Sequence, residues 1–488
     1  MNIDFNSASR LKLIVWTLLV LGCLVFLSSI FTRGITLDDA YFAEQSYWFE
    51  KNGYVRSELF RGVLNWEERS FVYHKLHVWQ GALLIKMVGW SPYLFKSLPI
   101  LYLVFFIFLA RLYFNGFITK DRTVYYFFLF LLFVHTFISQ YGFEFRPEIM
   151  IMTVGFASFF GIRAGLIHNR LSFIFLAGIM AGAAALFHLN GLIFIIAGMG
   201  LLVFNKAYRP LLFFIIASAL IFSLYFLELI PGENLSQYLY QFRNDPAINK
   251  DRLDSFGWLI KVVTAPKRHF SHVYEASFTI LFLFALILNW KEITKNIELK
   301  QVLIYLLCLE LTLSLISPGS KTMYLTYYIP YMLIVISSTL YLTLSRDGFR
   351  KTFFFLLFLF AVTHIGHTYR LSSKMKHDMP DTHAVIVEKY GINRSHSILA
   401  PENFIFNEIH NAKIQGFTSV MLSSGVHVFS TLENILDFAD HNNKDYVIIE
   451  NDMLAKIGNH RPRTGMVYSE YQLVGIEEGL YVFRAISN

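Results

Sequence analysis

The chain has few charged residues for its length, and this scarcity excludes an ordinary soluble protein. Of its 488 residues, 16% are Asp, Glu, Lys or Arg, 55% are hydrophobic and 50 are phenylalanine. Soluble globular domains carry about 25% charged residues. Apolar runs of about 17 to 25 residues recur between charged residues, which is the length that a helix needs to cross a bilayer. The composition therefore predicts a multi-pass membrane protein.

Cysteine is almost absent as well. Cys23 and Cys308 both lie inside apolar runs, so the sequence offers neither a disulfide framework nor a thiolate metal site in its aqueous parts. A clustered basic stripe is also missing, although the net charge is +7. The basic residues are spread among short loops, a distribution that orients a protein in a membrane and does not indicate a nucleic acid partner.

The apolar runs predict about eleven transmembrane helices. They lie near residues 13–31, 93–112, 123–139, 147–167, 172–187, 191–204, 210–227, 276–290, 301–317, 323–344 and 352–367. No small-residue cleavage site follows the first run, so we expect it to be a retained anchor. Alternate loops are rich in Lys and Arg, which predicts a cytoplasmic N-terminus in the inner (plasma) membrane. Two long loops, residues 32–91 (the first loop) and 228–275, then lie on the outer side.

The last part of the chain changes character. Residues 371–488 mix polar and apolar positions, with strand-like runs "HSILAP", "TSVMLS", "DYVIIEN" and "LYVFRA" and a helical pattern in "TLENILDFADHNN". We expect a transmembrane domain over residues 1–370 and a small soluble α/β domain over residues 371–488, outside the cytoplasm. The predicted fold class is thus a polytopic helical membrane protein with a C-terminal α/β domain.

The first loop opens with two adjacent carboxylates, Asp38 and Asp39. Thr36 or Asp38 can cap a helix that begins near Asp39 and ends at Gly53. This helix is rich in aromatic residues, which favours a position in the membrane interface. The simplest interpretation of the acidic pair is helix capping, and the alternative is a functional site.

Further polar residues gather on the same predicted side. Ionisable residues at membrane depth are costly, so several of them at one face indicate a site. They occur in "FEFRPE" and "SPGSKTMYLTYYIPYM", and the candidates are Arg146, Glu148, Lys321, Tyr324 and Tyr327. His188, in "FHLNG", either faces the substrate or is a residue that ends a helix.

These stretches resemble a known family. An early acidic pair followed by an aromatic helix ending in glycine resembles the first outer loop of the GT-C membrane glycosyltransferases, especially the branch with protein O-mannosyltransferases and the lipid A aminoarabinose transferase. "FRPE" is similar to that family's Arg-x-acid element, "FHLNG" to its His-containing hairpin, and "KTMYLTYYIP" to its Lys/Arg-x-x-Tyr segment. The resemblance covers roughly residues 10–370. Two departures are an Asp-Asp pair in place of Asp-Glu, and "VYHKLHVW" where the family often has His-Pro.

The resemblance implies that a sugar passes from a polyprenyl-phosphate-linked donor to an acceptor lipid, glycan or protein on the outer side, among membrane lipids. Such transfer needs a general base, for which we choose Asp38 first and Asp39 second, and an inverting reaction needs only one base. Cations and hydrogen-bond donors must stabilise the leaving phosphate. The candidates for this role are Arg56, Arg61, Arg146, Lys321, Tyr324 and Tyr327. A divalent cation, Mg²⁺ or Mn²⁺, at Asp38 and Asp39 suits these oxygens but is not required.

Several alternatives stay open. His74 and His77 have a spacing compatible with metal ligation, but a polar interfacial helix is the preferred interpretation. "HIGH", residues 364–367, copies a nucleotide-binding signature, but it ends an apolar run without a preceding Rossmann strand, so we reject that function. A non-enzymatic lipid or polysaccharide transporter predicts ionisable residues within spans and internal repeats. An O-antigen polymerase or ligase would lack the early acidic pair.

Overall fold

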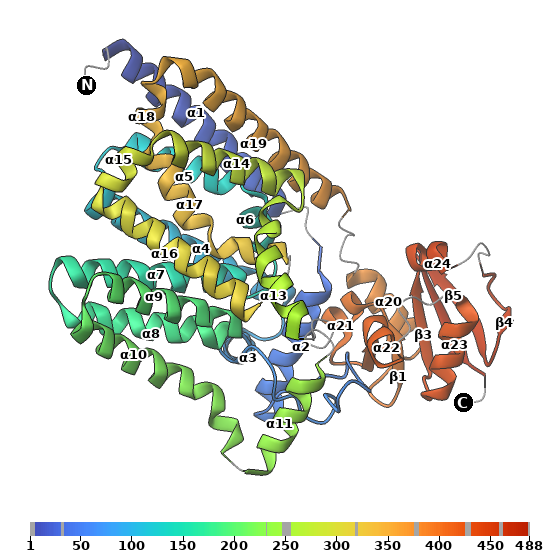
Figure 1. Ribbon diagram of the computed structural model, residues 1–488. Helices are drawn as coiled ribbons and strands as arrows, with labels where there is room; N and C mark the ends of the chain where they lie inside the picture. Colours follow the sequence, from blue (N-terminus) through green and yellow to red (C-terminus); the bar gives the residue numbers. More distant parts are fainter. Residues whose placement is uncertain are drawn as a thin grey trace.

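The computed structural model describes most of the chain, as residues 5–30, 34–230, 232–245, 255–317, 321–374, 380–424, 431–457 and 462–486. A large helical part comes first in the sequence, and a small sheet with short helices follows it (Figure 1). The predicted fold class is confirmed at this level, whereas the exact boundary near residue 370 stays a prediction.

The helical part begins with α1 (Phe5–Ile30), α2 (Leu37–Asn52), α3 (Lys75–Val88), α4 (Pro92–Tyr113), α5 (Arg122–Val134), α6 (Thr136–Tyr141), α7 (Glu148–Ile167), α8 (Leu171–Phe187), α9 (Leu192–Phe204), α10 (Tyr208–Ser223) and α11 (Gly232–Asn244). It continues with α13 (Ser255–Thr264), α14 (Val273–Leu288), α15 (Trp290–Lys295), α16 (Ile297–Ile316), α17 (Ile329–Ser338), α18 (Leu340–Leu344) and α19 (Asp347–Lys374). Short 3₁₀ segments include η2 (Leu189–Gly191), η3 (Leu224–Leu229), η4 (Ala265–Phe270) and η5 (Thr322–Tyr327), and η1 (Phe114–Ile118) is a π-helix.

By length and composition the chain is a multi-pass membrane protein. Within the described residues, six helices are long and apolar enough to cross a bilayer, and one further pair of helices qualifies jointly although it is bent by 92° at residues 271–272. Four shorter apolar helices accompany them. The count of about eleven spans stays a prediction. Two of the predicted spans are wrong as continuous helices: the run 123–139 is broken at His135, and the run 323–344 divides into η5, α17 and α18.

The predicted helix of the first loop is confirmed as α2. Thr36 is its N-cap and accepts a hydrogen bond from the backbone of Asp39, and Gly53 ends the helix with a φ of 72° that favours glycine. The expected position of the aromatic rings at the membrane interface is wrong for Phe42 and Tyr47, because residues 42–47 of α2 are buried within the protein on every side of the helix. Its aromatic residues form a protein core between α3 and the C-terminal part.

The C-terminal part forms one six-stranded sheet with strand order β2-β1-β3-β6-β5-β4. Its strands are β1 (Ser397–Ala400), β2 (Lys413–Gly416), β3 (Tyr446–Glu450), β4 (Val467–Tyr468), β5 (Tyr471–Glu477) and β6 (Leu480–Ala485). Its helices are α20 (Pro380–Lys389), α21 (Glu402–Glu408), α22 (Phe417–Ser424), α23 (Leu432–His441) and α24 (Asn451–Ile457). β2, β1 and β3 are parallel, and β6 joins β3 in antiparallel orientation.

Three of the four predicted strands are confirmed as β1, β3 and β6, and the predicted helix is α23. "TSVMLS" is wrong as a strand, because it lies in the helix α22 directly after β2. β2, β4 and β5 were not predicted. The sheet buries one core of its own around β3 and β6, including Val447 and Phe483.

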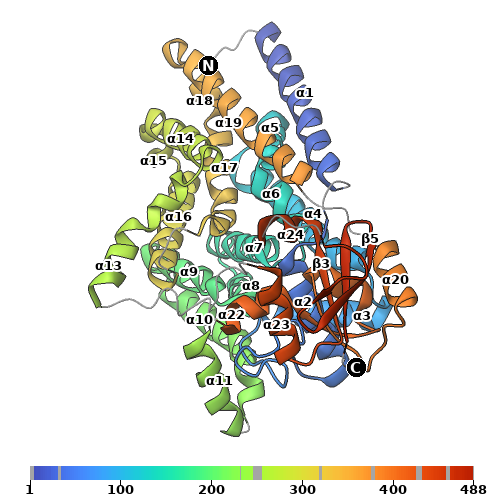
Figure 2. The same ribbon diagram turned by 90° about the vertical axis from the view of Figure 1, so that its right-hand side faces the viewer.

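The sheet lies beside the first loop (Figures 1 and 2). The backbone N–H of Gly416, at the end of edge strand β2, donates to the carbonyl of Leu59 at 3.0 Å. The indole of Trp90 donates to the carbonyl of Phe406 at 2.6 Å. The C-terminal part thus covers α2 and the segment that follows it.

Candidate functional site

Arg146 joins two carboxylates that come from distant parts of the sequence. It lies in the turn between α6 and α7. Its Nη1 forms an ion pair with Oδ2 of Asp38, on the first turn of α2. Its Nη2 and Nε bind the two oxygens of Glu148 at 2.7 and 3.1 Å, a bidentate arrangement that fixes the guanidinium plane. The structure therefore brings together the two sequence motifs "LDDA" and "FRPE".

The two carboxylates held by Arg146 differ in access. The Glu148 side chain is 2% exposed, whereas the Asp38 side chain is 39% exposed. Burial raises the pKa of Asp38 above that of an ordinary aspartate, the Glu148 carboxylate adds to the rise, and Arg146 opposes it. Asp38 is therefore the member of this group that solvent or a second molecule can reach.

Asp39 has a different environment from its neighbour. It is 1% exposed, and its Oδ2 accepts hydrogen bonds from the backbone N–H and the hydroxyl of Thr36 at 2.8 and 3.0 Å. Its Oδ1 accepts a hydrogen bond from the backbone N–H of Phe145, in the turn that carries Arg146. Asp39 thus completes the capping box of α2 and ties this helix to the Arg146 turn.

Histidine and tyrosine side chains pack ring against ring beside the Arg146 group. The rings of His74, the N-cap of α3, and His188, in the break between α8 and α9, have centroids 4.4 Å apart. His188 lies 6.1 Å from Tyr324 on η5, which stacks on Tyr327 at 5.8 Å. Burial lowers the pKa of His188 to about 4, and the nearby charges of Arg146 and Lys321 act in the same direction against Glu148. Four distant segments therefore converge near Arg146.

Arg56 and Arg61 are not part of this convergence in the part of the chain that the structure describes. Both pair with the carboxylate of Glu58, and Arg56 also stacks over Trp48 with a separation of 4.5 Å. Glu58 itself belongs to a segment anchored by the buried Glu44. Arg56 and Arg61 thus order the first loop near the sheet.

Two residues that we did not single out also belong to the convergence. His74 was discussed only as a member of a histidine pair, and Tyr141, at the end of α6, lies under the Arg146 guanidinium at 5.3 Å. His77 does not join His74, because it packs on Phe145 with ring centroids 4.1 Å apart. The i, i+3 spacing of the histidines gave no signal that one would face the site and the other the core.

Arg268 is a further buried cation near this end of the bundle. It lies on η4, which packs against η5, and its side chain is 0% exposed. Its Nε donates to the carbonyl of Ala265 at 2.9 Å, whereas Nη1 and Nη2 have no hydrogen-bond partner among the described residues. The carboxylate of Glu310, on α16, interacts electrostatically with Arg268, so the protein already supplies an anion near this buried guanidinium.

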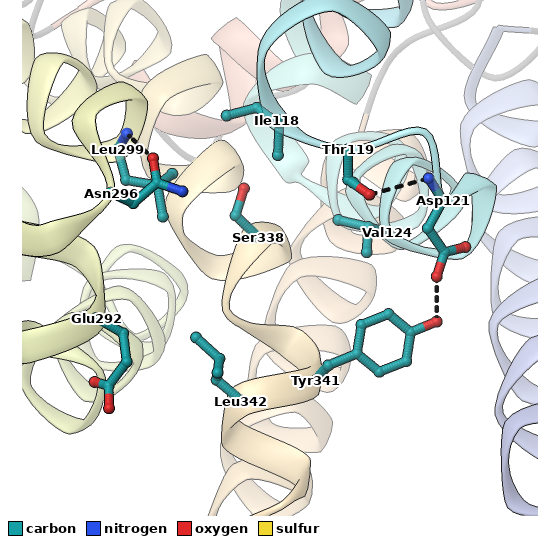
Figure 3. A pocket seen from close by; sticks show the side chains of 10 residues that line it. All are labelled: Ile118, Thr119, Asp121, Val124, Glu292, Asn296, Leu299, Ser338, Tyr341 and Leu342. Atoms are coloured by element: carbon teal, nitrogen blue, oxygen red, sulfur yellow. Dashed lines mark hydrogen bonds between the residues drawn. The ribbon is translucent and has the colours of Figure 1, made fainter. Parts of the chain in front are cut away.

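A polar pocket lies far from these residues. It has a volume of about 290 Å³ and is bordered by Asp121, Glu292, Asn296, Ser338 and Tyr341 together with apolar side chains (Figure 3). Tyr341 donates to Asp121 at 2.6 Å. Asp121 and Asn296 precede α5 and α16, at the end of the bundle opposite to the first loop (Figure 1). The pocket is therefore separate from the Arg146 group.

The fold is shared with solved membrane glycosyltransferases. No family model and no curated protein sequence matches the chain. Its structure is similar to ArnT from Cupriavidus metallidurans in the apo state, with a TM-score of 0.60 and 13% identity over 96% of this chain and 97% of that chain. ArnT bound to undecaprenyl phosphate gives the same TM-score and coverage at 12% identity.

A second similar structure is AglB, the oligosaccharyltransferase from Archaeoglobus fulgidus, in complex with an inhibitory peptide and a dolichol-phosphate. Its TM-score is 0.53, with 13% identity over 90% of this chain and 69% of that chain. ArnT and AglB are both GT-C membrane glycosyltransferases. The GT-C resemblance is therefore confirmed at the level of the fold.

The donor set does not fit a protein-held metal ion. An AglB structure of the same fold is a complex with Zn and sulfate. In the described part of this chain, no three His, Cys, Asp or Glu side chains converge as ligands. Arg146 binds the carboxylates of Asp38 and Glu148, and Asp39 is occupied by Thr36 and Phe145. The chemistry below therefore uses no metal-dependent step.

Proposed function

We propose that this protein is a glycosyltransferase that moves a sugar from a polyprenyl-phosphate-linked donor to an acceptor at the outer face of the membrane. The observation that carries the proposal is the ion-paired group of Asp38, Arg146 and Glu148, built from two motifs 108 residues apart. The shared fold supports it, because the solved ArnT and AglB structures contain undecaprenyl phosphate and a dolichol-phosphate.

Asp38 is the general base in this proposal. Arg146 holds its Oδ2, and Oδ1 carries no hydrogen bond within the described residues, so Oδ1 accepts the proton of the acceptor hydroxyl or amine. The acceptor atom bonds to the anomeric carbon while the bond from that carbon to the phosphate oxygen breaks. The lipid phosphate leaves with the electron pair, and one displacement inverts the anomeric configuration. Asp39 has no free oxygen for this role.

Arg146 positions the base and is not the main partner of the phosphate. Its single positive charge already faces two carboxylates, so the group has a net negative charge. The departing phosphate then needs other cations. Lys321, the residue before η5, supplies a cation in this proposal, and the stacked Tyr324 and Tyr327 of η5 supply hydroxyl donors.

The test is an Asp38→Asn variant. Purified protein is supplied with undecaprenyl phosphate carrying a radiolabelled sugar and with membrane extract as the acceptor source. We expect donor consumption to fall about 10²- to 10⁴-fold, the usual value of a positioned base. Asp121→Asn is the matched control, because Asp121 caps α5 at the opposite end of the bundle and asparagine caps a helix equally well. Turnover that survives in Asp38→Asn assigns the chemistry elsewhere.

The same assay separates the alternatives. A lipid or polysaccharide transporter would leave the donor chemically intact in wild type and variant alike. A polymerase or ligase that does not use the acidic pair would consume donor equally well after Asp38→Asn.

A further inference from the structure

Two buried histidines meet where the predicted span 123–139 is broken. His135 separates α5 from α6 with an extended backbone, φ −64° and ψ 119°, so the helix must start again at Thr136. The break leaves the first N–H groups of α6 without the carbonyls that a continuous helix would provide. His364, in the "HIGH" motif of α19, reaches the same point from the other end of the sequence.

Each imidazole satisfies one of these N–H groups. Nδ1 of His364 accepts the backbone N–H of Thr136 at 3.0 Å, and Nδ1 of His135 accepts that of Phe137 at 3.3 Å. The two rings lie 4.5 Å apart and are 0% and 1% exposed. The hydroxyl of Thr368 donates to that of Thr136 at 3.2 Å, which adds a second tie between α19 and α6.

The hydrogen bonds accepted at Nδ1 define the protonation state of both imidazole rings. An imidazole whose Nδ1 accepts a hydrogen bond is neutral and carries its proton on Nε2. A second proton would remove the acceptor and place a positive charge at a helix N-terminus, where the macrodipole disfavours cations. The titratable groups around this point are His135 itself, His364 and His367 on α19, and Tyr274 on α14. Among the described residues around this point, no carboxylate acts on the imidazole of His135 or of His364.

α6 connects the histidine pair to the candidate site. It has only six residues and ends at Tyr141, whose ring lies under the Arg146 guanidinium. The following turn is held by Asp39 at Phe145 and leads to Arg146. The start of α6 therefore sets where Tyr141 and the Arg146 turn lie.

We propose that His135 and His364 are positioning residues: as neutral hydrogen-bond acceptors they cap α6 and thereby hold Arg146 against Asp38. The catalytic consequence rests on the proposed function, whereas the capping does not. This gives His364 of the "HIGH" motif a role that is unrelated to nucleotide binding. Asparagine can replace the acceptor, because its Oδ1 occupies nearly the position of the imidazole Nδ1, and leucine cannot.

The experiment compares His364→Asn with His364→Leu, and His135→Asn with His135→Leu, in the full-length detergent-purified protein. Amide hydrogen exchange over residues 136–147 reports the cap without any substrate. We expect exchange roughly tenfold faster in the Leu variants, the usual effect of losing a cap, and near wild-type exchange in the Asn variants. With the undecaprenyl-phosphate-linked sugar, the Leu variants should lose kcat about tenfold or more while KM for the donor changes less than about threefold.

Three results would overturn the proposal. Exchange over 136–147 that stays at the wild-type rate in His364→Leu shows that the imidazole does not cap α6. If the Asn variants exchange these amide hydrogens as fast as the Leu variants, then packing of the imidazole ring, and not its hydrogen-bond acceptor, protects α6. If the Leu variants do not fold, Asn variants with wild-type exchange support the cap, and Asn variants with faster exchange refute it.

Wild-type protein without donor turnover refutes the proposed function, and the exchange data then decide the capping alone.

Discussion

Arg146 illustrates how one residue can assign different roles to neighbouring carboxylates. It binds Glu148 with two nitrogens in a buried, bidentate pair and Asp38 with one nitrogen at the accessible edge. Glu148 therefore fixes the guanidinium plane, and the guanidinium fixes Asp38. A lysine could neutralise the same charges but could not hold both carboxylates in one plane.

The pH dependence of transfer should report this arrangement. The ionised Asp38 is the active form, and burial raises its pKa above the ordinary aspartate value of about 3.9, so kcat/KM should rise with pH through an acid midpoint above that value. Arg146→Gln removes the cation that lowers this pKa, so the midpoint should move to higher pH while the rate falls. Arg346→Gln, which breaks an ion pair with Glu292, is the control. An acid midpoint that stays in place after Arg146→Gln would contradict the assignment.

At the scale of elements, α2 is held by a carboxylate that is not part of the site. Glu44 is 0% exposed; its Oε1 accepts the N–H groups of Trp48, Glu58 and Leu59, and Ser57 lies 2.5 Å from its Oε2. Burial raises the pKa of Glu44 to about 7. The helix that carries Asp38 is thus tied to the segment that meets the sheet.

Stability should follow the protonation of Glu44. The ordinary pKa of a glutamate is about 4.5 and that of Glu44 is about 7, so the folded state binds the proton more tightly than the unfolded state. This contribution, on the order of 3 kcal/mol, is fully present below about pH 4.5 and is lost as the pH rises through about 7. Glu44→Gln imitates the protonated form, so its thermal midpoint should lie close to that of wild type at pH 5 and exceed it clearly at pH 8. If the thermal midpoints of wild type and Glu44→Gln fall by the same amount between pH 5 and 8, a group other than Glu44 causes the pH dependence.

At the scale of the whole molecule, the C-terminal sheet supports the first loop. Its edge strand β2 is covered by the segment around Leu59, so an edge that could otherwise pair with another chain is closed. α21 packs on α2, and the Tyr47 hydroxyl lies 3.3 Å from the His410 imidazole. The sheet therefore stabilises α2 from the side opposite to α3.

Gly416→Val tests this support. A Cβ at Gly416 would lie 2.8 Å from Cδ1 of Leu59 and 3.3 Å from the Glu402 side chain, so valine should push the first loop away from β2. We expect limited proteolysis within residues 56–66 to become about tenfold faster and donor turnover to fall, because overpacking costs about 1 to 3 kcal/mol. Gly348→Val is the matched control, since a Cβ there meets no atom within 4 Å. Equal proteolysis of both variants would mean that the sheet does not hold the loop.

The sequence alone determined the membrane class, the helix α2 with its caps, most of the apolar helices and the residues of the "LDDA" and "FRPE" motifs. These features are local, because hydropathy, helix caps and acidic or basic side chains are properties of short segments. The GT-C resemblance followed from the order of such motifs, and the fold confirmed it.

Only the tertiary structure decided which polar residues meet. It tied Asp39 to Phe145 and left Asp38 accessible, and it placed Arg56 and Arg61 on Glu58 away from Arg146. It also broke the run 123–139 at His135 and supplied His364, 229 residues later, to satisfy the broken helix. Contacts between residues so far apart depend on how whole helices pack, and the hydrophobic periodicity of one segment does not encode its neighbours.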